Sequence, residues 1–253
     1  MPIDRRTFLL SGAATIGAGA RQSAGASPSH AGIRAIAFDA FPIFDPRPIG
    51  AACERLFPGR GTMLMNAWRA RQFDYQWLRS LGAHYADFWR CTADALSVAC
   101  ESAGIDASEA QKAELMQEWL RLDVWPDVPR ALHELRDRGF TLAFLSNATP
   151  AILDAGLRRA GLESLFAQVI STDRARTFKP HPAAYRLGTK MLGLRADQIL
   201  FVAFAGWDVA GAKWFGYPTF WNNRANAPAE RLDAVPDGGG ATLVELLEYL
   251  GNK

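Results

Sequence analysis

The sequence predicts an α/β protein in which a doubly wound, Rossmann-like parallel sheet carries a separate helical cap. Three observations favour this arrangement. A short apolar run leads to Asp39 near the start of the chain, and a long stretch with a helical pattern follows it. From Trp125 onward, apolar runs alternate with helical segments, which is typical of a parallel sheet covered by helices. With 253 residues, 49% of them hydrophobic, the chain can form one large or two modest domains.

The first strand of the sheet is predicted at residues 35–38, where apolar residues stand in an unbroken row. Such a run is typical of a parallel strand that is buried on both faces. Asp39 follows at the carboxyl end of this strand. We assign residues 31–46 to the core. Residues 47–124, which are rich in Trp, Arg and Ala and show few strand-like alternations, are assigned to the helical cap.

Residues 125–253 form the second part of the core, in which helices and strands alternate. Most of the predicted helices stop at a glycine, the residue most often found just past a helix end. Residues 236–240 read PDGGG and are predicted to form a loose loop. The predicted helices lie near residues 128–138, 150–160, 182–192, 208–215 and 243–250, and the predicted strands at residues 141–145, 167–171, 199–203 and 218–221.

Residues 1–26 match the pattern of a twin-arginine export signal. The pair Arg5-Arg6 precedes an apolar, Gly/Ala-rich run, and Ala24-Gly25-Ala26 offers a cleavage site. These residues are excluded from the fold, and the mature protein is expected in the periplasm. The alternative is a disordered basic N-terminus with no targeting role.

The composition indicates which classes of partner the protein is not expected to bind. The 28 basic and 26 acidic residues leave a formal net charge of +2, which gives no reason to expect nucleic acid or a membrane surface. No run reaches the roughly 18 consecutive apolar residues of a spanning helix, so no membrane span is expected. The three cysteines have no CxxC or Cys/His spacing that would indicate a metal site. The expected partner is a small molecule.

Polar residues follow several of the predicted strands. Asp39 follows the first strand, Ser146-Asn147 follows the strand at 141–145, and Lys179 and Asp208 lie beyond later strands. Ligands of doubly wound sheets bind at the carboxyl ends of the strands. These four positions are therefore expected to converge on one site.

The same residues carry a resemblance to a known family. The segments Phe38-Asp39-Ala40-Phe41, Leu145-Ser146-Asn147, Phe178-Lys179-Pro180 with Tyr185, and Trp207-Asp208 resemble the four motifs of the haloacid dehalogenase superfamily. More narrowly, the chain is similar to the type II L-2-haloacid dehalogenases, and the resemblance extends through the cap, for example at residues 67–69 and 75–81. It covers roughly residues 33–250.

Members of the superfamily that hydrolyse phosphate esters place a second Asp two residues after the nucleophile, where this chain has Phe41. Residues 203–205 also offer no carboxylate for Mg²⁺, a cation that needs several oxygen ligands. Phosphatase chemistry is therefore disfavoured. The resemblance implies a hydrolase of carbon–halogen bonds that acts on small (S)-2-haloalkanoic acids and haloacetates without metal or other cofactor.

The resemblance also implies roles for individual residues. Asp39 would attack C2 of the substrate and form an ester, a covalent route that splits one hard displacement into two steps. Lys179 would keep Asp39 charged, and with Asp208 it would activate the water that cleaves the ester. Tyr185 would support Lys179 or the carboxylate region.

The substrate would be held by groups from both domains. Arg69 and Asn147, with the edge of Phe88, would form a halide cradle that supplies donors where negative charge develops. Ser146 and backbone N–H groups near Ala40 and Asn147 would hold the substrate carboxylate. The apolar walls implied by the resemblance are Phe41, Phe73, Phe88 and Trp207.

Several of these residues have structural alternatives when the resemblance is set aside. Lys179 could be a surface lysine, and Arg69 could be a solvated or packing residue of the cap. Phe73 and Phe88 could be core residues. Asp208 could be a helix N-cap, a role that is compatible with catalysis.

The chain also departs from the family pattern. Pro42-Ile43 stand where a Gly-Thr pair is usual, and Ala203 and Ala205 replace a Ser and an Asn. Either water is held in another way by an active enzyme, which we favour, or ester hydrolysis is slow. A periplasmic binding protein for small carboxylates is the alternative from another functional class.

The resemblance further implies a homodimer.

Overall fold

A computed structural model describes residues 32–251 and shows a six-stranded sheet in which every strand pairing is parallel. The strand order is β3-β2-β1-β4-β5-β6, so the winding direction reverses beside β1, as it does in doubly wound folds. The predicted fold class is therefore confirmed. The strands are β1 Ala35–Phe38, β2 Thr141–Ser146, β3 Phe166–Ser171, β4 Ile199–Ala203, β5 Thr219–Asn222 and β6 Gly238–Gly240.

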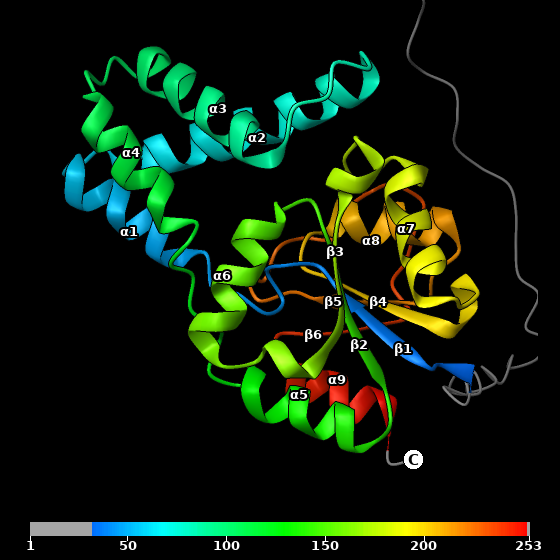
Figure 1. Cartoon of the computed structure of the whole chain (residues 1–253). Helices are drawn as coiled ribbons and strands as arrows, with labels where there is room; N and C mark the ends of the chain where they lie inside the picture. The colour runs from blue at the N-terminus through cyan, green and yellow to red at the C-terminus, as the bar shows by residue number, and fades with distance from the viewer. Residues whose placement is uncertain (1–31, 252–253) are drawn as a thin grey trace, which may run out of the picture.

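Helices cover both faces of the sheet (Figure 1). On β1, Ile36 and Phe38 belong to one buried apolar cluster and Ala35 and Ala37 to another, because successive side chains of a strand point to opposite faces. The first cluster continues into α5, α6 and α9, and the second into α7 and α8. The bounds of these helices are α5 Val128–Asp137, α6 Pro150–Ala160, α7 Pro182–Leu192, α8 Gly206–Phe215 and α9 Leu243–Leu250.

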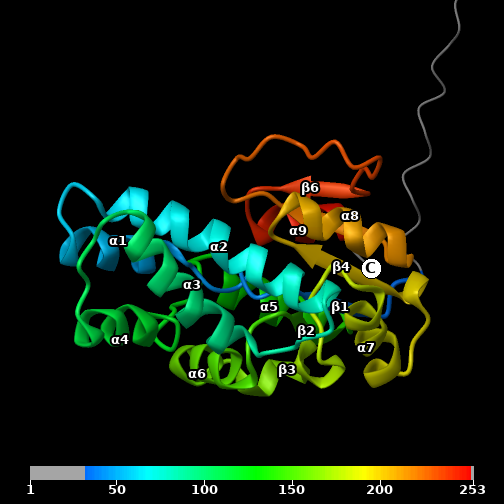
Figure 2. The ribbon, with the colours of Figure 1, turned by 90° about the horizontal axis from the view of Figure 1, so that it is seen from above.

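The helical segment between β1 and α5 forms a group of its own. Figures 1 and 2 both show its helices gathered to one side of the sheet. The chain leaves and re-enters the core at neighbouring points, because Phe44 and Val124 form an antiparallel bridge and Asp45 N donates to Asp123 O at 2.9 Å. The four helices are α1 Arg47–Leu56, α2 Gly61–Leu81, α3 Phe88–Ser102 and α4 Glu109–Glu118.

One predicted loop is wrong. Gly238–Gly240 form β6, which pairs in parallel with β5 at the edge of the sheet. The Asp237 carboxylate anchors the entrance to this strand by accepting from Thr219 N at 2.8 Å and from Lys213 Nζ at 2.9 Å. Glycines have no side-chain periodicity, so the backbone pairing that makes this strand leaves no trace in the sequence.

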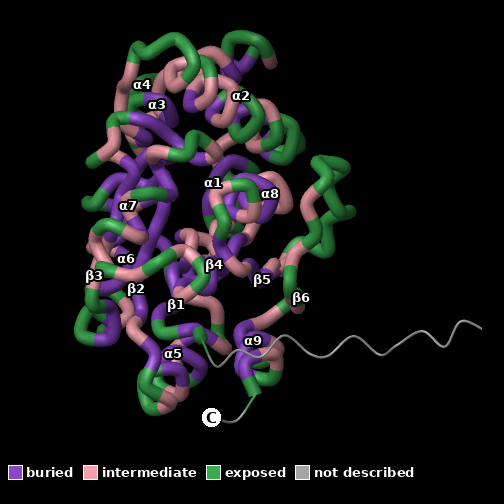
Figure 3. The backbone as a smooth tube through the Cα atoms, turned by 90° about the vertical axis from the view of Figure 1, so that its right-hand side faces the viewer, coloured by how far each residue is buried: buried purple, intermediate pink, exposed green. Residues whose placement is uncertain are grey.

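The interior of the described chain is closed around the strands, which Figure 3 shows as largely buried. All three cysteines lie in it as free thiols, and burial raises the pKa of Cys53 to about 12.

Within residues 32–251, none of the helices combines the length and the apolar character needed to cross a bilayer. The predicted export signal at residues 1–26 lies outside the described residues.

Candidate active site

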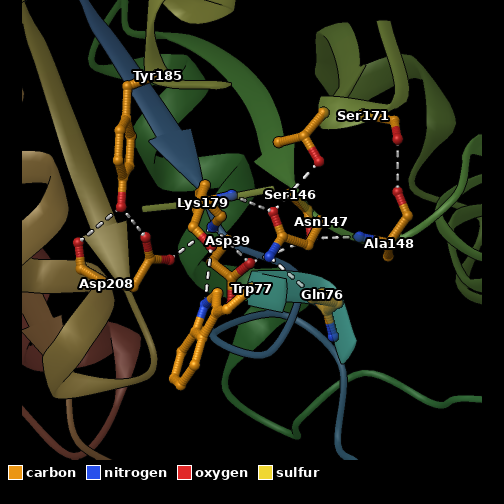
Figure 4. Close-up of polar contacts among 11 residues, drawn as sticks. Asp39, Gln76, Trp77, Ser146, Asn147, Ala148, Ser171, Lys179, Tyr185 and Asp208 are labelled. Carbon is orange, nitrogen blue, oxygen red and sulfur yellow. Dashed lines mark hydrogen bonds and ion pairs between the residues drawn. The ribbon is translucent and has the colours of Figure 1, made fainter. Parts of the chain in front are cut away.

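The predicted polar residues meet at the carboxyl edge of the sheet (Figure 4). Asp39 directly follows β1, Ser146 ends β2, and Asp208 lies in the first turn of α8 behind β4. Because β1 lies between β2 and β4, the loops after all three strands open onto the same point. Lys179 reaches this point from the segment between β3 and α7.

Lys179 is the centre of the polar network, with only 1% of the residue exposed. Its Nζ donates to Asp39 Oδ1 at 2.9 Å and to Asp208 Oδ2 at 2.5 Å. Burial alone would lower the pKa of Lys179, but the attraction of Asp208 and Asp39 outweighs it and raises the pKa. The alternative of a surface lysine is therefore wrong.

Asp208 is also buried, and it is held from two sides. One oxygen faces Lys179, and Oδ1 accepts from the Tyr185 hydroxyl at 2.6 Å. Burial raises the pKa of Asp208 to about 6; Asp39 acts in the same direction and Lys179 opposes it. The alternative of a helix N-cap is wrong, because α8 starts two residues earlier than predicted and Ala205 occupies the cap position.

Ser146 and Asn147 connect the nucleophile candidate to its surroundings. Ser146 Oγ donates to Asp39 Oδ1 at 3.1 Å. Asn147 Oδ1 accepts from Lys179 N at 2.9 Å and from Thr172 Oγ1 at 3.2 Å. Its Nδ2 donates to Gln76 Oε1 of the cap at 2.9 Å. Asn147 therefore joins the two domains.

A cavity of about 30 Å³ lies against Asp39, which is room for one or two water molecules. A 2-haloacid is larger than that, so its binding requires the cavity to widen. The lining comes from both domains: Asp39, Phe41, Ser146, Asn147, Ala148, Lys179, Phe204, Ala205 and Trp207 from the core, and Arg69, Gln72, Phe73, Gln76 and Phe88 from the cap. Ala40, Asp208 and Tyr185 do not line it. Asp208 binds the lining residue Lys179, and Tyr185 binds Asp208 in turn.

Arg69 borders both this cavity and an adjoining pocket of about 180 Å³. It has no hydrogen-bond or ion-pair partner among residues 32–251, and its guanidinium lies 5.8 Å from the centre of the Phe73 ring. Part of the residue is exposed to solvent, while desolvation by the protein lowers the pKa of the guanidinium. The cap thus places this cation at the cavity that Asp39 also lines, where the cation has neither a hydrogen bond nor an ion pair with the described residues.

Phe73 and Phe88 both border the cavity, but only Phe88 belongs to the buried core. Phe73 stacks on Trp77 and meets Trp207 edge-on, each with ring centres 5.6 Å apart, and it also lines the cavity. Phe88 is 4% exposed, packs edge-on against Trp119 and borders the same cavity. These packed rings form an aromatic wall of the cavity beside Asp39.

The sequence-based reasoning missed two glutamines of the cap. Gln72 and Gln76 line the cavity and are 3% and 0% exposed. Gln72 Nε2 donates to Thr92 Oγ1 at 2.6 Å. Both residues follow Arg69 at helical spacing, and this spacing could have placed them on the same face of α2.

Of the three apolar residues Ile43, Ala203 and Ala205, only Ala205 borders the cavity at Asp39. Ile43 and Ala203 are fully buried, and Ala205 lines the cavity. Among residues 32–251, no group of three or more His, Cys, Asp or Glu gathers in a way that could hold a metal ion. A cation at Asp39 and Asp208 would also have to displace the Lys179 ammonium that both carboxylates bind.

Comparison with known proteins places these features in context. A family model described as haloacid dehalogenase-like hydrolase matches residues 21–216. Haloacetate dehalogenase H-2 of Moraxella sp. (strain B) is 41% identical over 206 residues, which is 81% of this chain and 92% of that protein. The (S)-2-haloacid dehalogenase of Pseudomonas sp. (strain YL) is 39% identical over 225 residues, 87% of this chain and 97% of that protein.

Solved structures agree in fold. The L-2-haloacid dehalogenase RSc1362 superposes with a TM-score of 0.84 at 41% identity, over 86% of this chain and 98% of that one. The L-2-haloacid dehalogenase of Xanthobacter autotrophicus with chloropropionic acid covalently bound gives a TM-score of 0.76 at 35% identity, over 85% and 96% of the two chains.

Proposed function

The chain belongs to the haloacid dehalogenase-like hydrolases, and from this premise we propose that it hydrolyses small (S)-2-haloalkanoic acids and haloacetates. The products are the 2-hydroxy acid and halide. One observation carries the proposal. The Asp39 carboxylate is held by Lys179 and Ser146 at the edge of an aromatic-walled cavity that also contains the uncommitted cation Arg69.

In the first step, Asp39 attacks C2 of the 2-haloacid. A bond forms between a carboxylate oxygen and C2, the carbon–halogen bond breaks, and its electron pair leaves with the halide. Lys179 and Ser146 both bind Oδ1, so Oδ2 is the oxygen free to attack. Arg69 and Asn147 supply positive charge and a donor where the halide forms.

In the second step, water adds to the carboxyl carbon of the Asp39 ester. The bond between this carbon and Oδ2 breaks, the 2-hydroxy acid leaves with Oδ2, and one proton is released. Asp208 holds Lys179 beside the ester, and Tyr185 fixes Asp208 in turn. Because Ile43, Ala203 and Ala205 offer no side-chain donor or acceptor, water at the ester depends on Lys179 and backbone groups.

Halide release by the purified mature protein tests this function. We expect turnover of (S)-2-chloropropionate and chloroacetate, little turnover of (R)-2-chloropropionate, and no effect of EDTA or Mg²⁺. A phosphate ester assayed beside them should not be hydrolysed, since Phe41 cannot act as general acid. Mg²⁺-dependent phosphatase turnover would contradict the proposal, and tight binding of haloacetate or lactate without halide release would indicate a binding protein.

We propose that the protein is exported to the periplasm by the twin-arginine route, with residues 1–26 as the signal. The Arg5-Arg6 pair and the small residues up to Ala26 support this. Cell fractionation with intact-mass analysis should find a periplasmic chain that begins at Ser27. Replacement of both arginines by lysine should keep the protein in the cytoplasm, and unchanged export of that variant would contradict the proposal.

A homodimer is also proposed. Large apolar side chains remain exposed on the described surface, among them Leu81 at 85%, Leu78 at 61% and Trp214 at 60%. Leu81 and Trp214 border one apolar pocket of about 420 Å³, where α2 lies against the core. Light scattering should give twice the mass of one chain, and Leu81→Arg should shift it toward the monomer. A monomeric parent protein would contradict this proposal.

A further inference from the structure

Gln76 has a buried amide group of which only one half is used. The residue is 0% exposed, and its Oε1 accepts from Asn147 Nδ2 at 2.9 Å. Its Nε2 is buried and has no hydrogen-bond partner among residues 32–251. Leaving a buried donor unpaired is unfavourable, so such donors are rare and call for an explanation. The unpaired Nε2 atom therefore implies an acceptor that the described side chains of the protein do not supply.

The donors around Asn147 decide which end of Gln76 is free (Figure 4). The backbone N–H of Lys179 can only donate, and it donates to Asn147 Oδ1 at 2.9 Å. Asn147 must then present its Nδ2 to Gln76, and Gln76 must accept with its carbonyl oxygen. Exchange of the two amide atoms of Gln76 would set two donors against each other. Nε2 is the free end.

Gln76 is one of the residues that line the same cavity as Asp39. Gln76 and Arg69 are seven residues apart on α2, which places them two turns apart on one face of that helix. Asp39 comes from the core and both of these side chains come from the cap. The cavity thus has the nucleophile on its core wall and two uncommitted donors on its cap wall.

The next step rests on the proposed function. In a displacement at C2, the halogen departs on the side away from the attacking oxygen. Because Asp39 attacks from the core wall, the halogen faces the cap. We propose that Gln76 Nε2 donates a hydrogen bond to the departing halide, beside Arg69, while Oε1 holds Asn147 in place. The electron pair of the carbon–halogen bond leaves with the halide, and Gln76 keeps both of its protons throughout.

The test compares variants on two leaving groups. Gln76→Met keeps the side-chain length and removes both amide atoms, whereas Gln76→Glu keeps an acceptor for Asn147 and removes the N–H donor. Gln117→Met, at an exposed position of α4, is the matched control. Each protein is assayed for kcat and KM with (S)-2-chloropropionate and (S)-2-bromopropionate. Thermal unfolding confirms that the variants are folded, and Gln76→Leu replaces Gln76→Met if that protein unfolds.

Both Gln76→Met and Gln76→Glu should lower kcat/KM for the chloro substrate about 10- to 100-fold, the range for a hydrogen bond to a charged group. The bromo substrate should lose less, because bromide is the better leaving group and depends less on donors. The bromo-to-chloro ratio of kcat/KM should therefore rise at least about threefold. The control should match the parent protein in both respects.

Three results would overturn the inference. Equal losses on both substrates would mean that Gln76 acts on the substrate carboxylate and not on the departing halide. Parent-like rates in Gln76→Glu would mean that only the acceptor matters. Parent-like rates in Gln76→Met would mean that neither atom matters. A parent protein that releases no halide at all would instead overturn the proposed function, and this inference with it.

Discussion

The core wall and the cap wall of the cavity differ in how far the protein itself satisfies their polar groups. On the core wall, Lys179 binds two carboxylates, and Ser146 and Tyr185 bind one each. On the cap wall, Arg69 and the Nε2 atom of Gln76 have no hydrogen-bond or ion-pair partner among residues 32–251.

This difference separates two tasks. A buried network whose members satisfy one another contributes to stability and fixes the nucleophile before substrate arrives. A buried donor without a partner lowers stability, and it becomes useful when an anion appears between the walls. Substitutions in the core wall should therefore lower stability and activity together, whereas loss of an unpaired donor of the cap wall should lower activity without lowering stability.

The largest effect is expected for Asp39→Asn. An amide is a far weaker nucleophile than a carboxylate, so halide release should fall by at least about 10³-fold. The variant should remain folded, because Asn occupies the same space. Halide assays and circular dichroism measure the two effects. Activity above a tenth of the parent value would exclude Asp39 as nucleophile.

Lys179→Met tests the core wall. It leaves Asp39 and Asp208 facing each other without the cation between them, and breaking a buried pair costs about 3–5 kcal/mol. Halide release should fall about 10²-fold or more, since the nucleophile loses its positioning. Chemical denaturation and steady-state kinetics measure the two losses. Unchanged stability would contradict the view that this network holds the core wall together.

Arg69→Met is the matched test of the cap wall. Because Arg69 has no hydrogen bond or ion pair within residues 32–251 to lose and only a 5.8 Å contact with the Phe73 ring, the free energy of unfolding should change by less than about 0.5 kcal/mol. The rate of halide release should fall about 10²-fold, the usual effect of removing a donor to developing negative charge. A loss of stability as large as that of Lys179→Met would erase the difference between the walls.

The pH dependence of activity tests Asp208. Its raised pKa of about 6 means that it becomes protonated as the pH falls through 6, which weakens its hold on Lys179. Activity should therefore decline on the acid side of pH 6. The hydrogen bond from Tyr185 lowers the pKa of Asp208, so Tyr185→Phe should move this decline to higher pH. A profile that does not move would mean that another group controls the acid limb.

The smallest expected effect concerns Ala205. With Ile43, Ala203 and Ala205 apolar, ester hydrolysis should be slower than ester formation. Rapid mixing should give a burst of halide near one equivalent, and intact-mass analysis should show an adduct on the Asp39 peptide. Ala205→Asn should raise the steady rate a fewfold. Linear halide release without an adduct would show that water is held well by other groups.

Local sequence patterns specify most elements of the core and the candidate residues at the carboxyl edge of its sheet. Apolar runs and helix-ending glycines predicted β1, β2, β4, α6, α7 and α9 closely. The convergence of Asp39, Ser146, Asn147 and Lys179 followed as well, because parallel strands open onto a common edge. These features depend on local patterns and on one general property of doubly wound sheets, so a single sequence contains them.

Which polar groups have hydrogen-bond partners depends on the tertiary structure. Gln76 and Asn147 are 71 positions apart, and only their contact shows that one amide hydrogen donor is left over. The sequence allows Asp208 an N-cap role as well as a place beside Lys179, and only its contacts with Lys179 and Tyr185 decide between them. Strand β6 has no sequence pattern apart from its pairing. Whether a donor is satisfied depends on distances between residues remote in the chain, and residue types along a sequence do not specify those distances.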